Sequence, residues 1–274
     1  GNERTTSKHS FNVSVTATLG VYTLKNSYTT NEYINLTDPP APPESYILVG
    51  RGATWNTYYD ATTGDNVLDT YPEQVNYQPS PNSWQPINTT LTPLTQDSLA
   101  YAYGYCAGND RGPYAAFFKP NLQSTWPIAF AYNRSTDPTT TVIRTKLTSV
   151  GYIDPATWST HTLQNTQNSQ GQFTNNTATY PGVFTGTDVT YTYENLQLKE
   201  SITLSNTTKA LLLSHPPSQY GLGENSYLVF ATKIDSLGLT PYDGQDPISG
   251  NLTITQGIEF RDALNHFACA LPIG

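Results

Sequence analysis

The sequence has little charge and no methionine. Only 12% of its 274 residues are Asp, Glu, Lys or Arg. Its 13 basic residues are scattered, and the formal net charge is -8. Counterion release at a basic patch supplies most of the affinity for nucleic acid, so this distribution argues against a nucleic-acid partner. It argues equally against binding to an anionic membrane surface.

Long hydrophobic runs are also missing. The longest purely aliphatic run is residues 211–213, whereas a helix that crosses a bilayer needs about 20 apolar residues. We therefore expect no membrane insertion. No secretion signal is visible, but a mature secreted chain has lost that signal, and Gly1 is either a processed end or a cloning remnant.

The sequence has no recognisable motif of an enzyme active site. It has no G-x-S-x-G, H-E-x-x-H, P-loop or G-x-G-x-x-G pattern. His266 and Cys269 have half the spacing of a zinc site, without a second half. The sequence thus predicts no catalytic residue, no cofactor and no metal ligand. The 21 acidic residues leave open a glycosidase, which needs only two carboxylates. The four histidines are dispersed, at His9, His161, His215 and His266.

Residues that form strands and turns take the place of charged residues. Hydrophobic residues make up 36% of the chain and aromatic residues 12%. Abundant Thr, Asn, Ser, Gln and Tyr favour strands and turns over long helices. We predict an all-β protein with an antiparallel β-sandwich architecture, rich in loops and with little helix.

The length allows two sandwich regions with a boundary near Thr95. Residues 1–95 form an N-terminal β-region with a polar N-terminal arm, residues 1–10. This region contains a Pro-rich connector, residues 38–43 (DPPAPP). Because proline lacks the donor that a central strand needs, the connector is expected to be a stiff, polyproline-like segment. Residues 96–274 form the C-terminal β-sandwich region.

Alternation of apolar and polar residues predicts the individual strands. Residues 11–19 alternate most regularly, and residues 55–69 predict a hairpin that turns at 62–65. Residues 98–106 (SLAYAYGYC) predict a strand with three tyrosines on one face. Residues 258–271 predict a C-terminal hairpin, with a helix over 260–271 as the alternative.

The most informative stretch is residues 180–205. Val189, Tyr191 and Tyr193 alternate with threonines, and Glu194-Asn195 supplies turn chemistry. A second alternating segment begins at Leu198. The stretch therefore predicts a β-hairpin.

The same stretch carries a resemblance to a known family. Residues 180–202 resemble a segment in the amino-terminal β-region of large secreted, wall-associated and Rhs-type YD-repeat proteins and their DNRLRE-containing relatives. Residues 75–91 and 238–272 resemble the flanking segments in the same order. The resemblance covers about residues 70–274, although no YD repeats are present. It implies a secreted, non-catalytic structural module.

If the protein is secreted, its cysteines can form a disulfide and its asparagines can carry glycans. Cys106 and Cys269 are the two cysteines, and in a secreted protein a disulfide closing this long loop would be stabilising. We predict that disulfide, with two free buried thiols as the alternative. Seven Asn-x-Ser/Thr sequons are candidate N-glycosylation sites, at Asn12, Asn35, Asn88, Asn133, Asn175, Asn206 and Asn251.

Two classes of function stay open. The first is a non-catalytic extracellular module, an assembly or scaffold unit of a cell-surface protein, sheath, surface layer (S-layer) or filament. Its partners would be copies of itself or other surface proteins, and its N-terminal arm suggests strand addition between subunits. The second is a secreted carbohydrate-binding or carbohydrate-active protein that stacks glycans on an exposed aromatic surface. The stacking residues would be the tyrosine rows together with Trp55, Trp84, Trp126 and Trp158.

Overall fold

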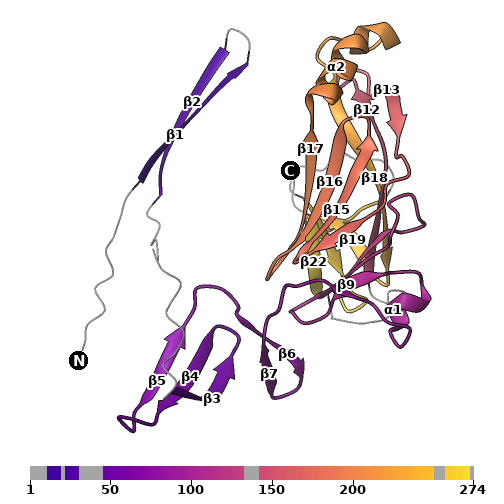
Figure 1. Ribbon diagram of the computed structural model, residues 1–274. Helices are drawn as coiled ribbons and strands as arrows, with labels where there is room; N and C mark the ends of the chain where they lie inside the picture. Colours follow the sequence, from indigo (N-terminus) through magenta and orange to yellow (C-terminus); the bar gives the residue numbers. More distant parts are fainter. Residues whose placement is uncertain (1–10, 20–21, 31–45, 133–141, 250–256, 272–274) are drawn as a thin grey trace. The chain divides into compact units, whose positions relative to one another are not determined.

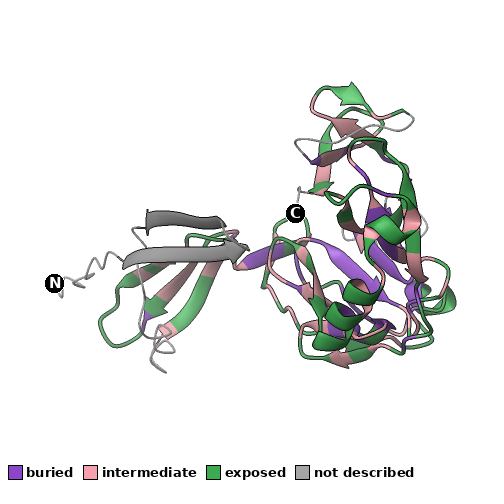
Figure 2. Ribbon diagram, turned by 90° about the horizontal axis from the view of Figure 1, so that it is seen from above, coloured by how far each residue is buried: buried purple, intermediate pink, exposed green. Residues whose placement is uncertain are grey.

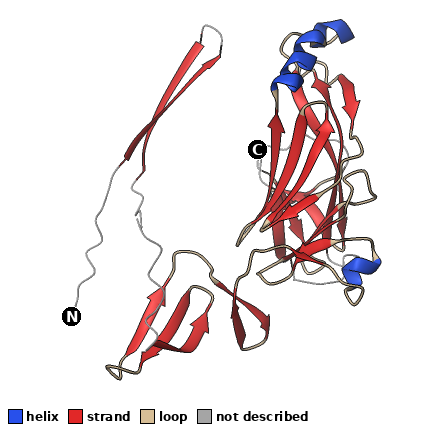
Figure 3. Cartoon of the chain, viewed as in Figure 1, coloured by secondary structure: helices blue, strands red, loops and turns tan. Residues whose placement is uncertain are grey.

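A computed structural model describes residues 11–19, 22–30, 46–132, 142–249 and 257–271. The chain divides into two units: residues 1–48 with 58–67 form the first, and residues 49–57 with 68–274 the second. Strands joined by loops make up most of the chain, with a few short helices (Figure 3). Within the described residues, the strand pairings of known register are antiparallel. The predicted all-β fold class is therefore confirmed.

The first unit contains a two-stranded hairpin, drawn in indigo in Figure 1. Strand β1 (Phe11–Leu19) pairs with β2 (Tyr22–Thr30), in a register that runs from Phe11 opposite Thr30 to Leu19 opposite Tyr22. The predicted strand over residues 11–19 is thus confirmed. Neither strand pairs with any other strand that the structure describes. The N-terminal arm and the Pro-rich connector lie outside the described residues.

Two small sheets follow along the chain. Strands β3 (Tyr46–Gly52), β4 (Trp55–Asp60) and β5 (Asn66–Thr70) form one sheet, and β6 (Asn76–Ser80) and β7 (Ser83–Pro86) form the other. The β4–β5 turn is fixed by Asp60, whose carboxylate accepts a hydrogen bond from the backbone N–H of Thr62 at 2.8 Å. Gly64 adopts a φ of 79°, which glycine tolerates without strain. The predicted hairpin over 55–69 is confirmed.

The main sheet of the second unit has seven strands. Its order is β13-β12-β11-β10-β9-β8, and β18 pairs with the other side of β12. The boundary expected near Thr95 falls between β8 and β9, which are paired. The strands are β8 (Thr92–Pro93), β9 (Ala107–Asn109), β10 (Ala115–Phe118), β11 (Ile128–Ala131), β12 (Val142–Ile153), β13 (Thr160–Asn165) and β18 (Tyr227–Leu237).

A second sheet of four strands contains the hairpin predicted from residues 180–205. Its order is β14-β15-β16-β17, and β16 and β17 are joined through Glu194 and Asn195. The hairpin prediction is confirmed. The strands are β14 (Gln172–Thr174), β15 (Thr177–Phe184), β16 (Thr187–Tyr193) and β17 (Leu198–Leu204).

The sandwich core lies between these two sheets. Phe118 and Leu147 of the main sheet pack in one cluster with Tyr180 and Val189 of the second sheet. The hydroxyl of Tyr193 donates to the backbone oxygen of Tyr114 at 2.7 Å, and the two rings stack at 4.4 Å. Buried residues gather in the strands of this unit (Figure 2).

A third sheet carries the C-terminal hairpin. Its order is β20-β19-β21-β22, with strands β19 (Thr240–Asp243), β20 (Asp246–Pro247), β21 (Ile258–Arg261) and β22 (Phe267–Leu271). The hairpin is confirmed over the helical alternative. Its turn is held by Asp262, whose carboxylate accepts hydrogen bonds from the backbone N–H groups of Leu264 and His266, each at 2.9 Å.

The strand predicted over residues 98–106 is wrong. Residues Leu99–Ala102 form a short helix, α1, and Gly104 follows with a φ of 82°. The three tyrosines therefore share no face: Tyr101 and Tyr103 are exposed, while Tyr105 is buried. Alanine favours the helical turn, and the buried Ala100 anchors it in a cluster with Tyr105.

Two further helical segments follow β17. Helix α2 (Asn206–Ser214) begins where the side chain of Ser205 accepts a hydrogen bond from the backbone N–H of Thr207. A 3₁₀ turn, η1 (Pro217–Tyr220), comes next. The sequence analysis did not predict α2. Among the described residues, no helix has the length and apolar character needed to cross a membrane.

Candidate functional site

The described residues of the second unit form an apolar groove of about 610 Å³. One side is lined by residues 196–200, which lead into β17, and the other by residues 267–271, which form β22. The main sheet also contributes to the lining, with Ile128, Phe130 and Ile143. We call this cavity the edge groove; both of its flanking strands are labelled in Figure 1.

Both flanking strands are sheet edges. Among the described strands, β17 pairs only with β16, and β22 pairs only with β21. The outer edge of such a strand presents a row of backbone N–H and C=O groups that can pair with another strand. The edge groove therefore combines an apolar lining with two unpaired backbone edges.

The register of β16 and β17 decides which side chains face the groove. Val189 lies opposite Ile202, Tyr191 opposite Glu200, and Tyr193 opposite Leu198. Residues directly opposite each other project from the same face of a sheet. Because the three β16 residues are buried in the core, their three β17 partners face the sandwich interior.

A carboxylate therefore occupies a core-facing position on the edge strand. Burial raises the pKa of Glu200, and a hydrogen bond from the Tyr191 hydroxyl partly offsets this by lowering it. Burial and the nearby Glu200 charge raise the pKa of Tyr191 well above its usual value. Glu200 remains accessible at the mouth of the groove, so apolar neighbours desolvate it only in part. Inward-pointing charges on edge strands are a known means of limiting uncontrolled pairing.

The sequence analysis did not single out Glu200. The available signal was the alternation of side chains along a strand. Leu198, Glu200 and Ile202 occupy every second position, so they project from one face of the predicted strand. An acidic residue between two core-facing aliphatic residues is the deviation that would have marked this position.

The two cysteines are free in the structure, so the predicted disulfide is not formed. Cys106 lies beside β10, where its thiol donates to the backbone oxygen of Phe118 at 3.5 Å. Cys269 lies in β22 and packs against the cluster that contains Phe260. Burial raises the pKa of Cys106 and raises that of Cys269 to about 12. The Cys106 thiol bonds to β10 of the main sheet, whereas Cys269 lies in β22 of the third sheet, and this separation over two sheets is the physical reason that the two are not bridged.

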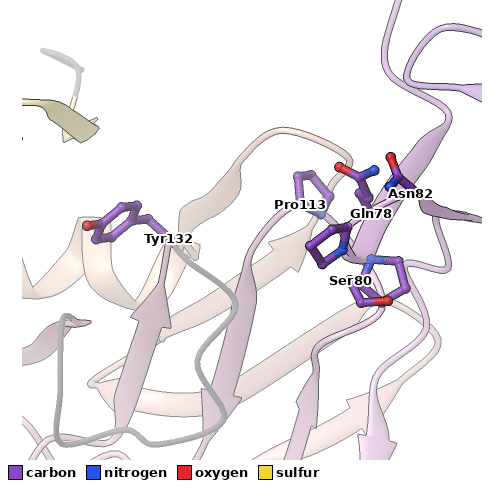
Figure 4. A pocket seen from close by; sticks show the side chains of 7 residues that line it. Gln78, Ser80, Asn82, Pro113 and Tyr132 are labelled. Carbon is purple, nitrogen blue, oxygen red and sulfur yellow. The ribbon is translucent and has the colours of Figure 1, made fainter.

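A second hollow, of about 480 Å³, is lined mainly by neutral polar residues and prolines. In Figure 4, Tyr132 lies across this hollow from Gln78, Ser80, Asn82 and Pro113. Burial raises the pKa of Tyr132, and the nearby charges of Asp262 and Cys269 raise it further. Its lining contains no carboxylate or imidazole, so it offers no acid–base pair for catalysis.

The described histidines have local structural partners. Nδ1 of His266 lies 3.3 Å from the carboxylate of Asp262, and the ring of His161 stacks on Tyr220 at 3.6 Å. Nδ1 of His215 lies 3.1 Å from the backbone oxygen of Leu211. Within the described ranges, no three His, Cys, Asp or Glu side chains are grouped so as to hold a metal ion. His9 lies outside those ranges.

The four tryptophans are dispersed over different elements. Trp158 is 61% exposed and Trp55 is 38% exposed, while Trp84 and Trp126 are half-buried. The guanidinium of Arg144 lies 5.4 Å from the centre of the Trp126 ring. None of the four lines the edge groove or the polar hollow.

Three of the predicted sequons lie on described, exposed residues: Asn88, Asn175 and Asn206. Asn175 occupies the turn between β14 and β15 with a φ of 51°, and Asn206 begins α2. Asn12 lies in β1. The other sequons fall outside the described residues, at Asn35, Asn133 and Asn251.

Comparisons with protein-family models, with curated proteins and with solved structures find no match to the chain. The resemblance of residues 70–274 to the β-region of YD-repeat surface proteins therefore stays a prediction. The function has to be argued from the groove and from the strands that flank it.

Proposed function

We propose that the protein is a non-catalytic, extracellular structural module that assembles with copies of itself or with other surface proteins by strand addition. The observation that carries this proposal is the edge groove, where apolar side chains meet the edges of β17 and β22 that no described strand pairs with. Stable monomers normally cover such edges; on β17 the inward-pointing Glu200 limits pairing without covering the edge. An uncovered edge beside an apolar groove favours pairing with an added strand.

The β1–β2 hairpin also supports the proposal, because it could supply the strand that is added. Within the described residues its sheet has two strands, and an isolated two-stranded hairpin is marginally stable in water. Pairing with a further strand would stabilise it. The chain thus has both a strand that gains from pairing and an edge that can receive one.

Composition and sequons support an extracellular location at the cell surface. The chain covers its surface with neutral Thr, Asn, Ser and Gln rather than with charge. The three described, exposed sequons are accessible to a bulky glycan. These features fit a subunit of a surface layer, sheath or filament.

Assembly of the full chain tests the proposal. Size-exclusion chromatography with light scattering and negative-stain electron microscopy should show ordered oligomers or polymers. A chain without residues 1–30 should remain monomeric, whereas a chain without residues 1–10 keeps β1 and should still assemble. A full chain that stays monomeric at high concentration contradicts the proposal.

Carbohydrate binding is a second candidate, favoured by Trp158. This exposed aromatic residue adopts a φ of 58° in the turn after β12, and backbone strain tends to occur at functional sites. The candidate predicts that a glycan array detects binding and that Trp158→Ala abolishes it. Absence of binding on a broad array removes this candidate.

A further inference from the structure

We infer that the edge groove is the acceptor site for strand β1 of a second copy of this chain, which adds to the free edge of β17. This inference rests on the proposed function and identifies the two surfaces that would form the contact. It follows from the size of the groove, from the chemistry of β1 and from the pairing of β1 with β2.

The groove has the size of one short strand. A strand rises about 3.3 Å per residue, neighbouring strands lie about 4.8 Å apart, and sheets pack about 10 Å apart, so five residues of a packed strand fill on the order of 800 Å³, about half of it on the one face that enters the groove. The groove volume of about 610 Å³ is of the same order. The five residues of β22 that line one side give the groove a matching length.

Strand β1 has the composition that this site requires. Its nine residues, FNVSVTATL, carry no charge. Apolar and polar residues alternate along it, from Phe11 to Leu19, so one face of the strand is apolar throughout. An added strand needs this pattern, since one face enters the apolar groove while the other faces solvent.

The hairpin can add as a unit without unfolding. The register places Tyr22, Leu24 and Tyr28 on the apolar face of β1, so β2 continues that face except at Asn26 and Thr30. Addition of β1 to β17 would extend the four-stranded sheet to six strands. The DPPAPP run between the hairpin and β3 predicts a stiff spacer, and the cross-linking experiment below separates a neighbouring copy from the chain's own groove.

Glu200 gives the site selectivity. Its core-facing carboxylate would meet the inner face of any strand added to β17, so acidic strands would be repelled there. The hydrogen bond with Tyr191 keeps this carboxylate partnered. An uncharged strand such as β1 adds no repulsion.

Cysteine cross-linking between two different chains tests the inference. One chain carries Ser201→Cys in the middle of β17, and its partner carries a single cysteine in β1; the native cysteines are replaced by alanine in both. Ser201 lies between the core-facing residues Glu200 and Ile202 and so belongs to the outer face of β17. A disulfide between neighbouring strands requires both residues on the same face.

The face of β1 that carries the cysteine therefore decides the expected result. Mild oxidation should yield heterodimers when the β1 cysteine replaces a polar residue, Ser14, Thr16 or Thr18. The matched variants at Val13, Val15 and Ala17 should lose this product, because their side chains enter the groove.

Each other outcome is informative. Cross-linking that favours the cysteines at Val13, Val15 and Ala17, or that does not distinguish the two sets of positions, overturns the inferred placement of β1. Cross-links that form only when both cysteines are in one chain show that the groove receives its own strand, which also overturns the inference. Assembly without any cross-link overturns the inference and leaves the proposed function standing. A parent chain that never assembles contradicts the proposed function itself.

Discussion

Replacing Phe267 by alanine should weaken assembly and leave the fold intact. Phe267 lines the edge groove, and 63% of its surface is exposed. Full burial of a phenylalanine side chain is worth about 1.5–3 kcal/mol, so covering the exposed part with β1 of a second copy would contribute about 1–2 kcal/mol. Phe267→Ala should therefore weaken each contact between subunits by about 5- to 30-fold.

Sedimentation velocity over a range of protein concentrations measures the strength of the contact, and chemical unfolding measures the stability of the fold. The stability of Phe267→Ala should stay within about 0.5 kcal/mol of the parent, as for other surface substitutions. Leu264→Ala is the matched control, because Leu264 is 75% exposed in the turn of the same hairpin but does not line the groove. Unchanged assembly of Phe267→Ala, or an equal loss in Leu264→Ala, would refute the reasoning.

Three further predictions follow from the fold, the groove and the sequons. Phe118 is fully buried between the rings of Phe173 and Tyr191, at 6.4 and 6.1 Å, so Phe118→Ala should cost about 3–5 kcal/mol in denaturant unfolding; a cost below about 1 kcal/mol contradicts the packing. Because burial raises the pKa of Glu200, the folded chain holds this proton more tightly than the unfolded chain, and stability should fall as pH rises through the folded-state pKa. Covering the groove desolvates Glu200 further, so assembly should also weaken as pH rises. Glu200→Gln should flatten the pH dependence of both stability and assembly. If the variant keeps the parent's pH dependence, Glu200 does not cause it. Intact-mass and glycopeptide analysis of native material should find added mass at the three described, exposed sequons, Asn88, Asn175 and Asn206. Unmodified asparagines at these positions count against a glycosylated surface protein.

Local patterns were sufficient to predict the hairpins. In residues 187–204, alternation and the Glu194-Asn195 turn act within a few residues of each other, and the observed register agrees with them. The same holds for the hairpin over residues 258–271, where Asp262 closes the turn through its own backbone neighbours. Short-range chemistry decides such elements, so the sequence displays it directly.

Two elements were not predicted correctly from the sequence, because local signals compete there. In residues 98–106 the tyrosines alternate with alanine and glycine, and this pattern fits a strand as well as a helical turn. Burial of Ala100 and the left-handed conformation of Gly104 favour the turn. In α2, the Ser205 cap and residues 209–213 are helix signals that the short aliphatic run concealed.

The edge groove depends on long-range pairing that no single stretch reveals. It requires that β17 end one sheet, that β22 end another, and that both lie against the main sheet. The disulfide prediction failed for the same reason, since Cys106 contacts β10 of the main sheet and Cys269 lies in β22 of the third sheet. Strands can be predicted from alternation, but their neighbours are set by the tertiary fold.

The most direct test of the account is a cryo-electron microscopy reconstruction of the assembled full chain. The account predicts density for an extended strand along the free edge of β17, traceable to residues 11–19 of a neighbouring copy. An assembly in which the groove is empty, or is filled by a different segment, would contradict the account.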